Sequence, residues 1–371
     1  MTDLPLPTLT ALVLCAAFAV SFAFGAIAQR TEFCTMGAIA DVYSMGDWTR
    51  ARMWALAIAI AVLGFNAMVA LGWVQARDTI YAAPRLLWLS AIAGGLAFGF
   101  GMVLASGCGS RNLVRLGSGN LKSIVVVVVL GISALATLRG ITAVLRVNSV
   151  DRIGADLGAG QDLPSLAAAA LGSSTPALAA ALGGALALAI VAWVLARPEG
   201  RRGDVWLGGV GIGATIVAFW WVSGRLGHLA EHPETLEAAF LATDSRKMES
   251  LSMVAPVGYA LDWLMLFSDR SKALSVGVVS VVGIFAGALV VARATRTFHW
   301  QGFSRVEDFA NHLVGGVLMG VGGITALGCT VGQGLSGVST LSLGSFLALG
   351  AIIAGAWLAL HYLSWRAGRD G

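Results

Sequence analysis

The chain has 371 residues, of which 57% are hydrophobic and 12% are charged, and its mean hydropathy is +0.81. Apolar runs of about 20 residues recur throughout, which is typical of a polytopic membrane protein and excludes a soluble globular core. The net charge of +4 is modest and no block of like charges occurs, so we set nucleic-acid binding aside.

Nine segments are long and apolar enough to cross a bilayer as helices, and no lysine or arginine precedes the first of them. Because that first segment also lacks a small-residue cleavage site, we interpret it as a retained span and not as a signal peptide. The predicted spans cover residues 9–28, 51–73, 87–107, 122–145, 175–196, 205–222, 273–292, 309–327 and 342–363.

Two further apolar stretches, residues 31–41 and 254–267, are too short to cross the bilayer. We predict that they are re-entrant or interfacial helices. Non-spanning backbone at membrane depth is tolerated only inside protein or along a cavity, so both stretches are candidates for lining a path.

Lysine and arginine concentrate in alternate loops, and this distribution predicts the orientation. The short loop that carries Arg197, Arg201 and Arg202 is assigned to the cytoplasm by the positive-inside rule. With nine spans, this assignment places the N-terminus outside and the C-terminus in the cytoplasm.

An internal repeat relates residues 94–108 ("GGLAFGFGMVLASGC") to residues 315–329 ("GGVLMGVGGITALGC"), with seven of the fifteen pairs identical. The same offset pairs Asp41 with Asp262 and places Ala255 opposite Cys34. The sequence is therefore duplicated.

Four spans precede the span at 175–196 and four follow it. The odd linker span inverts the second set, so we predict one transport domain made of two inverted-topology repeats, about 9–146 and about 205–363. In such folds the substrate site lies near the midplane, where short or Gly-interrupted segments of the two halves meet.

The four cysteines are spaced too widely for a CxxC pair or a zinc cluster, and the five histidines lack ligand spacing, so we predict no metal and no cofactor. Cys15 lies inside an uninterrupted apolar span and is interpreted as a small buried hydrophobe. Cys108 and Cys329 each follow a glycine where a span ends, which lets a solute approach the thiol. Cys34, in "EFCTMG", is either a packed interfacial thiol or part of the same path.

The glycines divide into two groups. The GxxxG pairs Gly95/Gly99 and Gly316/Gly320 predict close helix packing. The GxGxxG pattern at 332–337 lies between apolar spans and not in a βαβ unit, which excludes a dinucleotide site; we interpret it as anion-facing backbone. The residues that we expect to face an anion or to tune a thiol pKa are Gly107, Gly109, Arg111, Gly328, Thr330 and Gln333.

Arg111, three residues after Cys108, has two interpretations. It binds the anion or tunes the pKa of the Cys108 thiol, or it is an ordinary arginine of a cytoplasmic loop. Asp41 and Asp262 likewise serve either as interfacial caps and ion-pair partners or as proton carriers.

At "TEFCTMGAIAD", "ASGCGSRNLVRLGSGN" and "GCTVGQGLSG" the chain resembles the YeeE/YedE sulfur-transport family. The resemblance implies uptake of thiosulfate, or a related sulfur anion, across the bacterial inner membrane. Carried over by motif, Cys34, Cys108 and Cys329 would be the thiols of the substrate path, ordered from outside as Cys329, Cys108 and Cys34. Residues 223–252 show no match to the family pattern.

The mechanism implied by the resemblance is a relay of weak S–H hydrogen bonds, without covalent transfer and without catalysis. A small cytosolic TusA-like sulfur-carrier protein is a candidate partner, because consumption inside would keep the gradient steep. Two alternatives stay open: a membrane thiol or persulfide oxidoreductase, and a transporter of another sulfur or selenium species.

Overall fold

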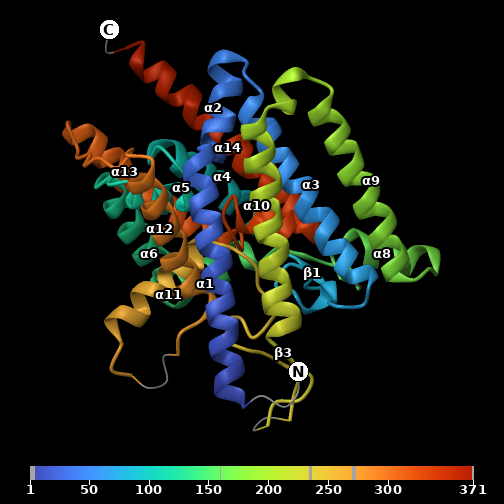
Figure 1. Ribbon diagram of the computed structural model, residues 1–371. Coiled ribbons are helices and arrows are strands. Elements are labelled where there is room, and N and C mark those ends of the chain that lie inside the picture. Colours follow the sequence, from blue (N-terminus) through green and yellow to red (C-terminus); the bar gives the residue numbers. More distant parts are fainter. Residues whose placement is uncertain (1–4, 159, 234–235, 270–272, 370–371) are drawn as a thin grey trace.

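The computed structural model describes residues 5–158, 160–233, 236–269 and 273–369. Within these ranges, regular structure is almost entirely helical, and eight helical segments are long and apolar enough to cross a membrane. The chain is an all-α polytopic membrane protein, as the composition predicted. Helix α1 (Leu6–Thr31) begins at one end of the bundle and α14 (Leu343–Ala367) ends at the other (Figure 1).

The first half of the chain contains long helices that alternate with short ones. After α1 come α2 (Thr35–Met45), α3 (Thr49–Ala70), α4 (Trp88–Leu104), α5 (Gly109–Gly117), α6 (Lys122–Arg139) and α7 (Ile141–Asn148). The 3₁₀ turns η1 (Ala76–Asp78) and η2 (Val150–Arg152) lie in the connections. Strands β1 (Arg85–Leu86) and β2 (Ala155–Asp156) pair antiparallel, with Arg85 opposite Asp156.

Two helices, α8 (Leu163–Leu171) and α9 (Thr175–Leu195), link the halves, and α9 packs along α3. The second half comprises η3 (Pro198–Arg201), α10 (Gly203–Trp221), the π-helical η4 (Val222–Leu226), α11 (Val254–Met265), α12 (Val276–Ala294), α13 (Val306–Thr325), the π-helical η5 (Gly332–Gly337) and α14. Strands β3 (His228–Leu229) and β4 (Ala239–Phe240) pair antiparallel, with His228 opposite Phe240.

The packing of the long helices repeats between the halves. Helix α4 packs along α14 as α13 packs along α6, and α1 packs along α12 as α10 packs along α3. Helices that occupy equivalent positions in the two halves also contact each other: α4 contacts α13, and α1 contacts α10. The four long helices of the first half, α1, α3, α4 and α6, correspond in this order to α10, α12, α13 and α14. When each helix is replaced by its counterpart, the same packed pairs result, as expected for a duplicated chain. The boundaries of the halves and their opposite orientation in a membrane stay predictions.

The glycine pairs hold helices in close contact, as predicted. A Cβ added at Gly99 would overlap the carbonyl oxygen of Ile352 on α14, and one at Gly320 would lie 2.6 Å from that of Leu130 on α6. A Cβ at Gly95 would lie 2.7 Å from that of Ala351. These helices approach each other at a distance that only glycine permits.

The structure differs from the predicted spans at two places. The span predicted at 122–145 is interrupted, because Gly140 adopts an extended conformation that ends α6 and starts the short, unburied α7. The span predicted at 309–327 corresponds to α13, which is not among the eight apolar segments because Glu307, Asp308 and His312 occupy its first two turns. The short stretch at 31–41 overlaps α2, which continues to Met45, and the stretch at 254–267 contains α11; both helices are too short to cross a bilayer.

Candidate functional site

Each of the three cysteines that the sequence singled out stands between a long helix and a short one. Cys34 is the N-cap of α2, after α1, and Cys108 is the N-cap of α5, after α4. Cys329 follows α13 and lies three residues before η5. The chain therefore uses one local arrangement three times.

The backbone before each cysteine has the same unusual conformation. The residue two positions earlier is left-handed in every case: Glu32 (φ 52°), Ser106 (φ 55°) and Leu327 (φ 59°). The next residue donates its N–H to a carbonyl five residues back, from Phe33 to Ala28 at 3.1 Å, from Gly107 to Met102 at 2.8 Å and from Gly328 to Gly323 at 2.7 Å.

This pattern is the Schellman cap of a helix C-terminus. A left-handed non-glycine residue costs about 1–2 kcal/mol. The same cap also ends α12 at Arg296, where the Thr297 N–H donates to the Ala292 carbonyl at 2.9 Å and no cysteine follows. What the three sites share is a buried cysteine directly after the cap.

The thiols themselves are buried. Their residues are 7%, 1% and 0% exposed for Cys34, Cys108 and Cys329, whereas Cys15 is exposed on α1, contrary to its interpretation as a buried residue. The Cys34 sulfur accepts from the Gly37 N–H at 3.3 Å, and the Cys329 sulfur accepts from the Gly332 N–H at 3.4 Å. The Cys108 sulfur lies 3.3 Å from the Ser110 hydroxyl oxygen.

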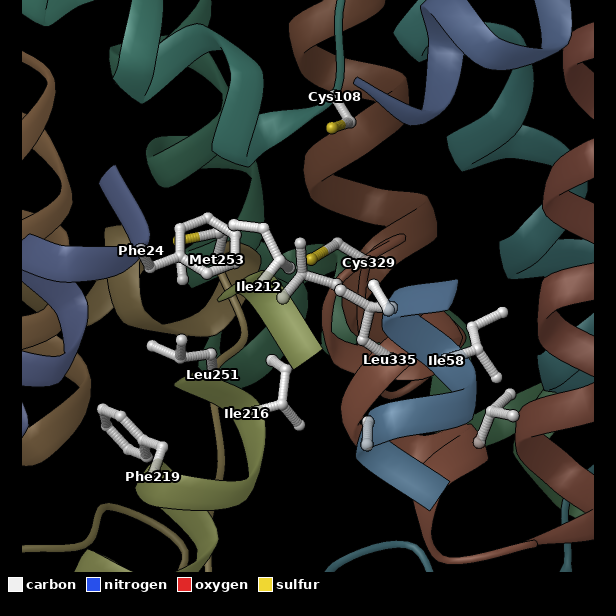
Figure 2. Close-up of a cluster of buried hydrophobic side chains, with 14 of the residues drawn as sticks. Phe24, Ile58, Cys108, Ile212, Ile216, Phe219, Leu251, Met253, Cys329 and Leu335 are labelled. Atoms are coloured by element: carbon white, nitrogen blue, oxygen red, sulfur yellow. The ribbon is translucent and has the colours of Figure 1, made fainter. Parts of the chain in front are cut away.

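A thiol that accepts an N–H bond through its lone pair keeps its own S–H proton for another partner. Cys108 and Cys329 belong to the same cluster of buried hydrophobic residues. Figure 2 shows Cys108 and Cys329 at successive levels of the core, with Ile212, Met253 and Leu335 beside Cys329. The structure thus brings Cys108 and Cys329 into one buried cluster, and it buries Cys34 at the N-cap of α2.

Two polar residues adjoin Cys329. Thr330 is fully buried, and its hydroxyl has no hydrogen-bond partner among the residues that the structure describes. The Gln333 amide nitrogen donates to the Ala326 carbonyl, while its buried oxygen lacks a partner. Gly328 is close to this amide, since a Cβ there would lie 3.1 Å from the Gln333 side chain. Orphaned polar atoms at this depth favour a polar solute beside the thiol.

A cavity of about 210 Å³ reaches the Cys329 level from the end of the bundle where α1 begins. Its lining includes Tyr81, Glu249, Ser252 and Gly328. A Cβ at Gly332 would lie 2.6 Å from the Ser252 hydroxyl and 3.5 Å from that of Tyr81, so this cavity borders the backbone that binds the Cys329 sulfur. We call it the outer cavity.

A larger cavity, of about 660 Å³, opens at the end of the bundle where α1 ends, and its lining includes Ser106 and Arg111, which precede and follow Cys108 in the chain. It is rich in cations, because Arg30, Arg111, Arg115 and Lys122 line it. Lys122 pairs with Asp308 at 2.6 Å, and Arg115 donates to the Ser106 carbonyl at 2.6 Å. We call it the inner cavity.

Arg111 is the predicted anion-facing residue that the inner cavity contains. The Nε of Arg111 is buried and has no hydrogen-bond partner within the described part of the chain. Gly107 and Gly109 flank Cys108 beside it: a Cβ at Gly107 would lie 3.2 Å from the Arg111 side chain, and Gly109 is the first residue of α5. An orphaned guanidinium nitrogen on a cationic wall favours an anion over an ordinary loop contact.

The loop at 223–252, which had no match in the family pattern, contributes directly to the core. Its last part inserts beside η5: Leu251 and Met253 are 1% and 0% exposed, and the Ser336 hydroxyl donates to the Leu251 carbonyl at 2.7 Å. Because the loop is rich in charged residues, its buried end was not predicted from the sequence. The alternation of Leu251 and Met253 with Ser250 and Ser252 was the available signal.

Two further residues support η5 and were missed. The Asn66 side chain donates to the Ser339 carbonyl at 2.9 Å, and the Trp220 indole donates to the Ser339 hydroxyl at 3.0 Å. Both come from long helices, α3 and α10, where a single polar atom in an apolar run gives no positional signal.

Comparison with known proteins identifies the family. A family described as "Sulphur transport" matches residues 30–358, a range that contains Cys34, Cys108 and Cys329. The thiosulfate transporter TsuA of Escherichia coli K12 is 28% identical over 343 residues, covering 90% of each chain. TsuA of Spirochaeta thermophila is 26% identical over 341 residues, covering 91% of this chain and 95% of that protein.

A shorter similarity links the chain to the probable transporter YedE of Salmonella typhimurium, 33% identical over 87 residues, or 23% of this chain and 20% of that protein. The family match spans most of the chain and both of its halves. This multi-pass membrane protein therefore belongs to the sulphur transport family.

Proposed function

We propose that the protein imports thiosulfate across the bacterial inner membrane along a path lined by Cys329, Cys108 and Cys34. The observation that carries the proposal is the repeated arrangement of the three thiols, each buried after a Schellman cap, between a cavity at either end of the bundle. The long relatives named thiosulfate transporters support the choice of substrate.

The thiols would act as weak donors. A thiol S–H bonds weakly to a soft sulfur anion, so successive thiols would hold thiosulfate without trapping it. No covalent bond forms and no catalysis takes place. The backbone N–H bonds to Cys34 and Cys329 support this role, because they orient each sulfur and leave its proton for the solute.

The anion would enter by the outer cavity and leave by the inner one. The positive-inside pattern supports this direction, with the N-terminus outside and the C-terminus in the cytoplasm. Arg111, whose Nε has no partner among the described residues, would bind the anion on the cytoplasmic side of Cys108. The other cations of the inner cavity would add to this attraction. A cationic exit draws a dianion inward past the last thiol.

Uptake must overcome the membrane potential. Moving one negative charge inward costs about 2.3 kcal/mol per 100 mV, and thiosulfate carries two charges. Rapid consumption inside would offset this cost, and a TusA-like sulfur carrier docked at the inner cavity is the partner that we propose for it.

The test is uptake of labelled thiosulfate by cells or vesicles that carry Cys→Ala variants. We expect Cys34→Ala, Cys108→Ala and Cys329→Ala each to reduce the initial rate at least ten-fold, with Cys15→Ala as the matched control at the wild-type rate. Wild-type rates in all three path variants would refute the relay.

Two alternatives are separated in the same preparation. A covalent thiol or persulfide oxidoreductase would leave a persulfide on Cys108 or Cys329, which mass spectrometry after exposure to substrate would detect. Competition by sulfite, sulfate and selenium analogues identifies the preferred anion. Uptake of an analogue without uptake of thiosulfate would refute thiosulfate as the substrate and leave the proposed transport function in place.

A further inference from the structure

Two carboxyl groups line the outer cavity, which is unexpected at the entrance for an anion. They are those of Asp244 and Glu249, and Arg146 is the cation among the described residues of the lining. Arg146 already pairs with Asp151, with Nε and carboxylate oxygen 3.1 Å apart. A dianion on its way to Cys329 would therefore pass two carboxyl groups, and their repulsion opposes entry whenever both are ionised.

Glu249 is held firmly at this position. Its carboxylate accepts the Ser245 N–H at 2.7 Å, and its own N–H donates to the Ser223 hydroxyl at 2.9 Å. Its neighbours in sequence are buried, and the Ser250 hydroxyl donates to the Ile216 carbonyl at 3.2 Å. From there the chain continues through Leu251 toward Cys329, so Glu249 lies at the start of the segment that borders the path.

The other ionisable groups facing Glu249 come from four elements. They are Tyr81 before β1, Arg146 on α7, Asp244 in the same loop and Tyr259 on α11. Behind Tyr259, Arg139 lies over its ring at 5.9 Å and 3.9 Å from Asp262. No histidine occurs among the described residues that line the cavity, so a histidine titration does not compete with that of the carboxyl.

The titration behaviour of these groups singles out Glu249. Burial among protein atoms raises the pKa of Glu249 to about 7, with Asp244 adding to the rise. Burial also raises the pKa of Tyr81 and of Tyr259, so both phenols stay neutral at physiological pH. The Glu249 carboxyl therefore changes charge within the range of pH that a bacterial surface meets.

We propose that Glu249 is a proton-binding residue of the outer cavity, and that a dianion enters toward Cys329 only when this carboxyl is neutral. The proton comes from external water and stays on the carboxyl oxygen, so no bond of the substrate changes. The inference rests on the proposed function, since it requires an anion to pass this cavity. It makes uptake depend on external pH through one side chain.

The experiment measures initial uptake of labelled thiosulfate between about pH 5.5 and about pH 8.5 outside, with internal pH and membrane potential clamped. The neutral fraction of a carboxyl with a pKa of about 7 falls about thirty-fold over this range, so the wild-type rate should fall by up to that factor. Glu249→Gln keeps the bond from the Ser245 N–H and should import at the acid-limit rate at every pH. Glu237→Gln, an exposed residue of the same loop, should keep the wild-type profile.

The outcomes distinguish the two proposals. Wild-type uptake that is independent of pH, or a Glu249→Gln variant that retains the wild-type profile, overturns the inference and leaves the proposed function standing. A Glu249→Gln variant that elutes and melts like wild type yet imports at no pH also overturns it, because a neutral amide should admit the anion. Absence of wild-type thiosulfate uptake at every pH rejects the proposed function and this inference with it.

Discussion

Asn66 is the side chain through which α3 supports the segment that follows Cys329. It is 2% exposed, and its amide nitrogen donates to the Val62 carbonyl at 2.8 Å and to the Ser339 carbonyl at 2.9 Å. In Asn66→Leu, which has a similar shape, the Val62 carbonyl keeps its helical bond while the Ser339 carbonyl loses a donor. Leaving a buried carbonyl without this donor costs about 1–3 kcal/mol of stability. In membrane proteins the cost of losing one hydrogen bond lies at the lower end of this range.

We therefore expect Asn66→Leu to lower the free energy of unfolding by about 1–2 kcal/mol. The measurement is reversible unfolding of the purified protein in mixed micelles of mild detergent and SDS. Asn148→Leu is the control, because that amide bonds the Val144 carbonyl at 3.0 Å at an exposed helix end, and it should change stability by less than about 0.5 kcal/mol. An Asn66→Leu protein as stable as the control variant would refute the role assigned to Asn66.

Two further predictions concern the frame and the outer loop. Gly99→Ala forces a Cβ onto the Ile352 carbonyl and should cost about 1–3 kcal/mol in the same unfolding assay, whereas Gly350→Ala meets open space and should be neutral or slightly stabilising; equal stability of the two variants would contradict the packing. The pKa of Glu249 is raised on folding, so the native state binds the proton more tightly and stability should fall as pH rises from about 4.5 to about 7, by about 1–3 kcal/mol. Glu249→Gln should remove that part of the pH dependence. If the free energy of unfolding varied with pH in the same way in wild type and in Glu249→Gln, the burial of this carboxyl would be contradicted.

The repeat in the sequence was sufficient to predict the repeated packing of the long helices and the equivalent positions of Cys108 and Cys329, whereas it gave Cys34 no cysteine partner. Gly107 and Gly328 marked the ends of two spans, and Cys329 acquired a partner in Cys108 through their common offset. The helix ends themselves were not predictable. Glu32, Ser106 and Leu327 adopt the left-handed conformation that glycine normally takes, because tertiary packing and not local preference imposes it.

Contacts between segments that are distant in the chain also could not be predicted from the sequence. The loop containing Glu249 reads as polar and solvent-exposed, yet its end is held in the core by η5 and α10. The break after α6 was missed because Gly140 inside an apolar run is equally compatible with a continuous helix. The pairing of Asn66 with Ser339 spans 273 positions of the chain, and one chain's sequence carries no record of such a contact.

The burial of the three path thiols has a consequence for kinetics. A chain with Cys15→Ala retains only cysteines that are 7% exposed or less, so a water-soluble alkylating reagent can react only while the bundle is open. In the orientation proposed above, reagent added outside would sample opening toward Cys329, and reagent added inside would sample opening toward Cys108 and Cys34. The alkylation half-times of this one variant, with and without thiosulfate, would therefore time the two openings separately without any attached fluorophore.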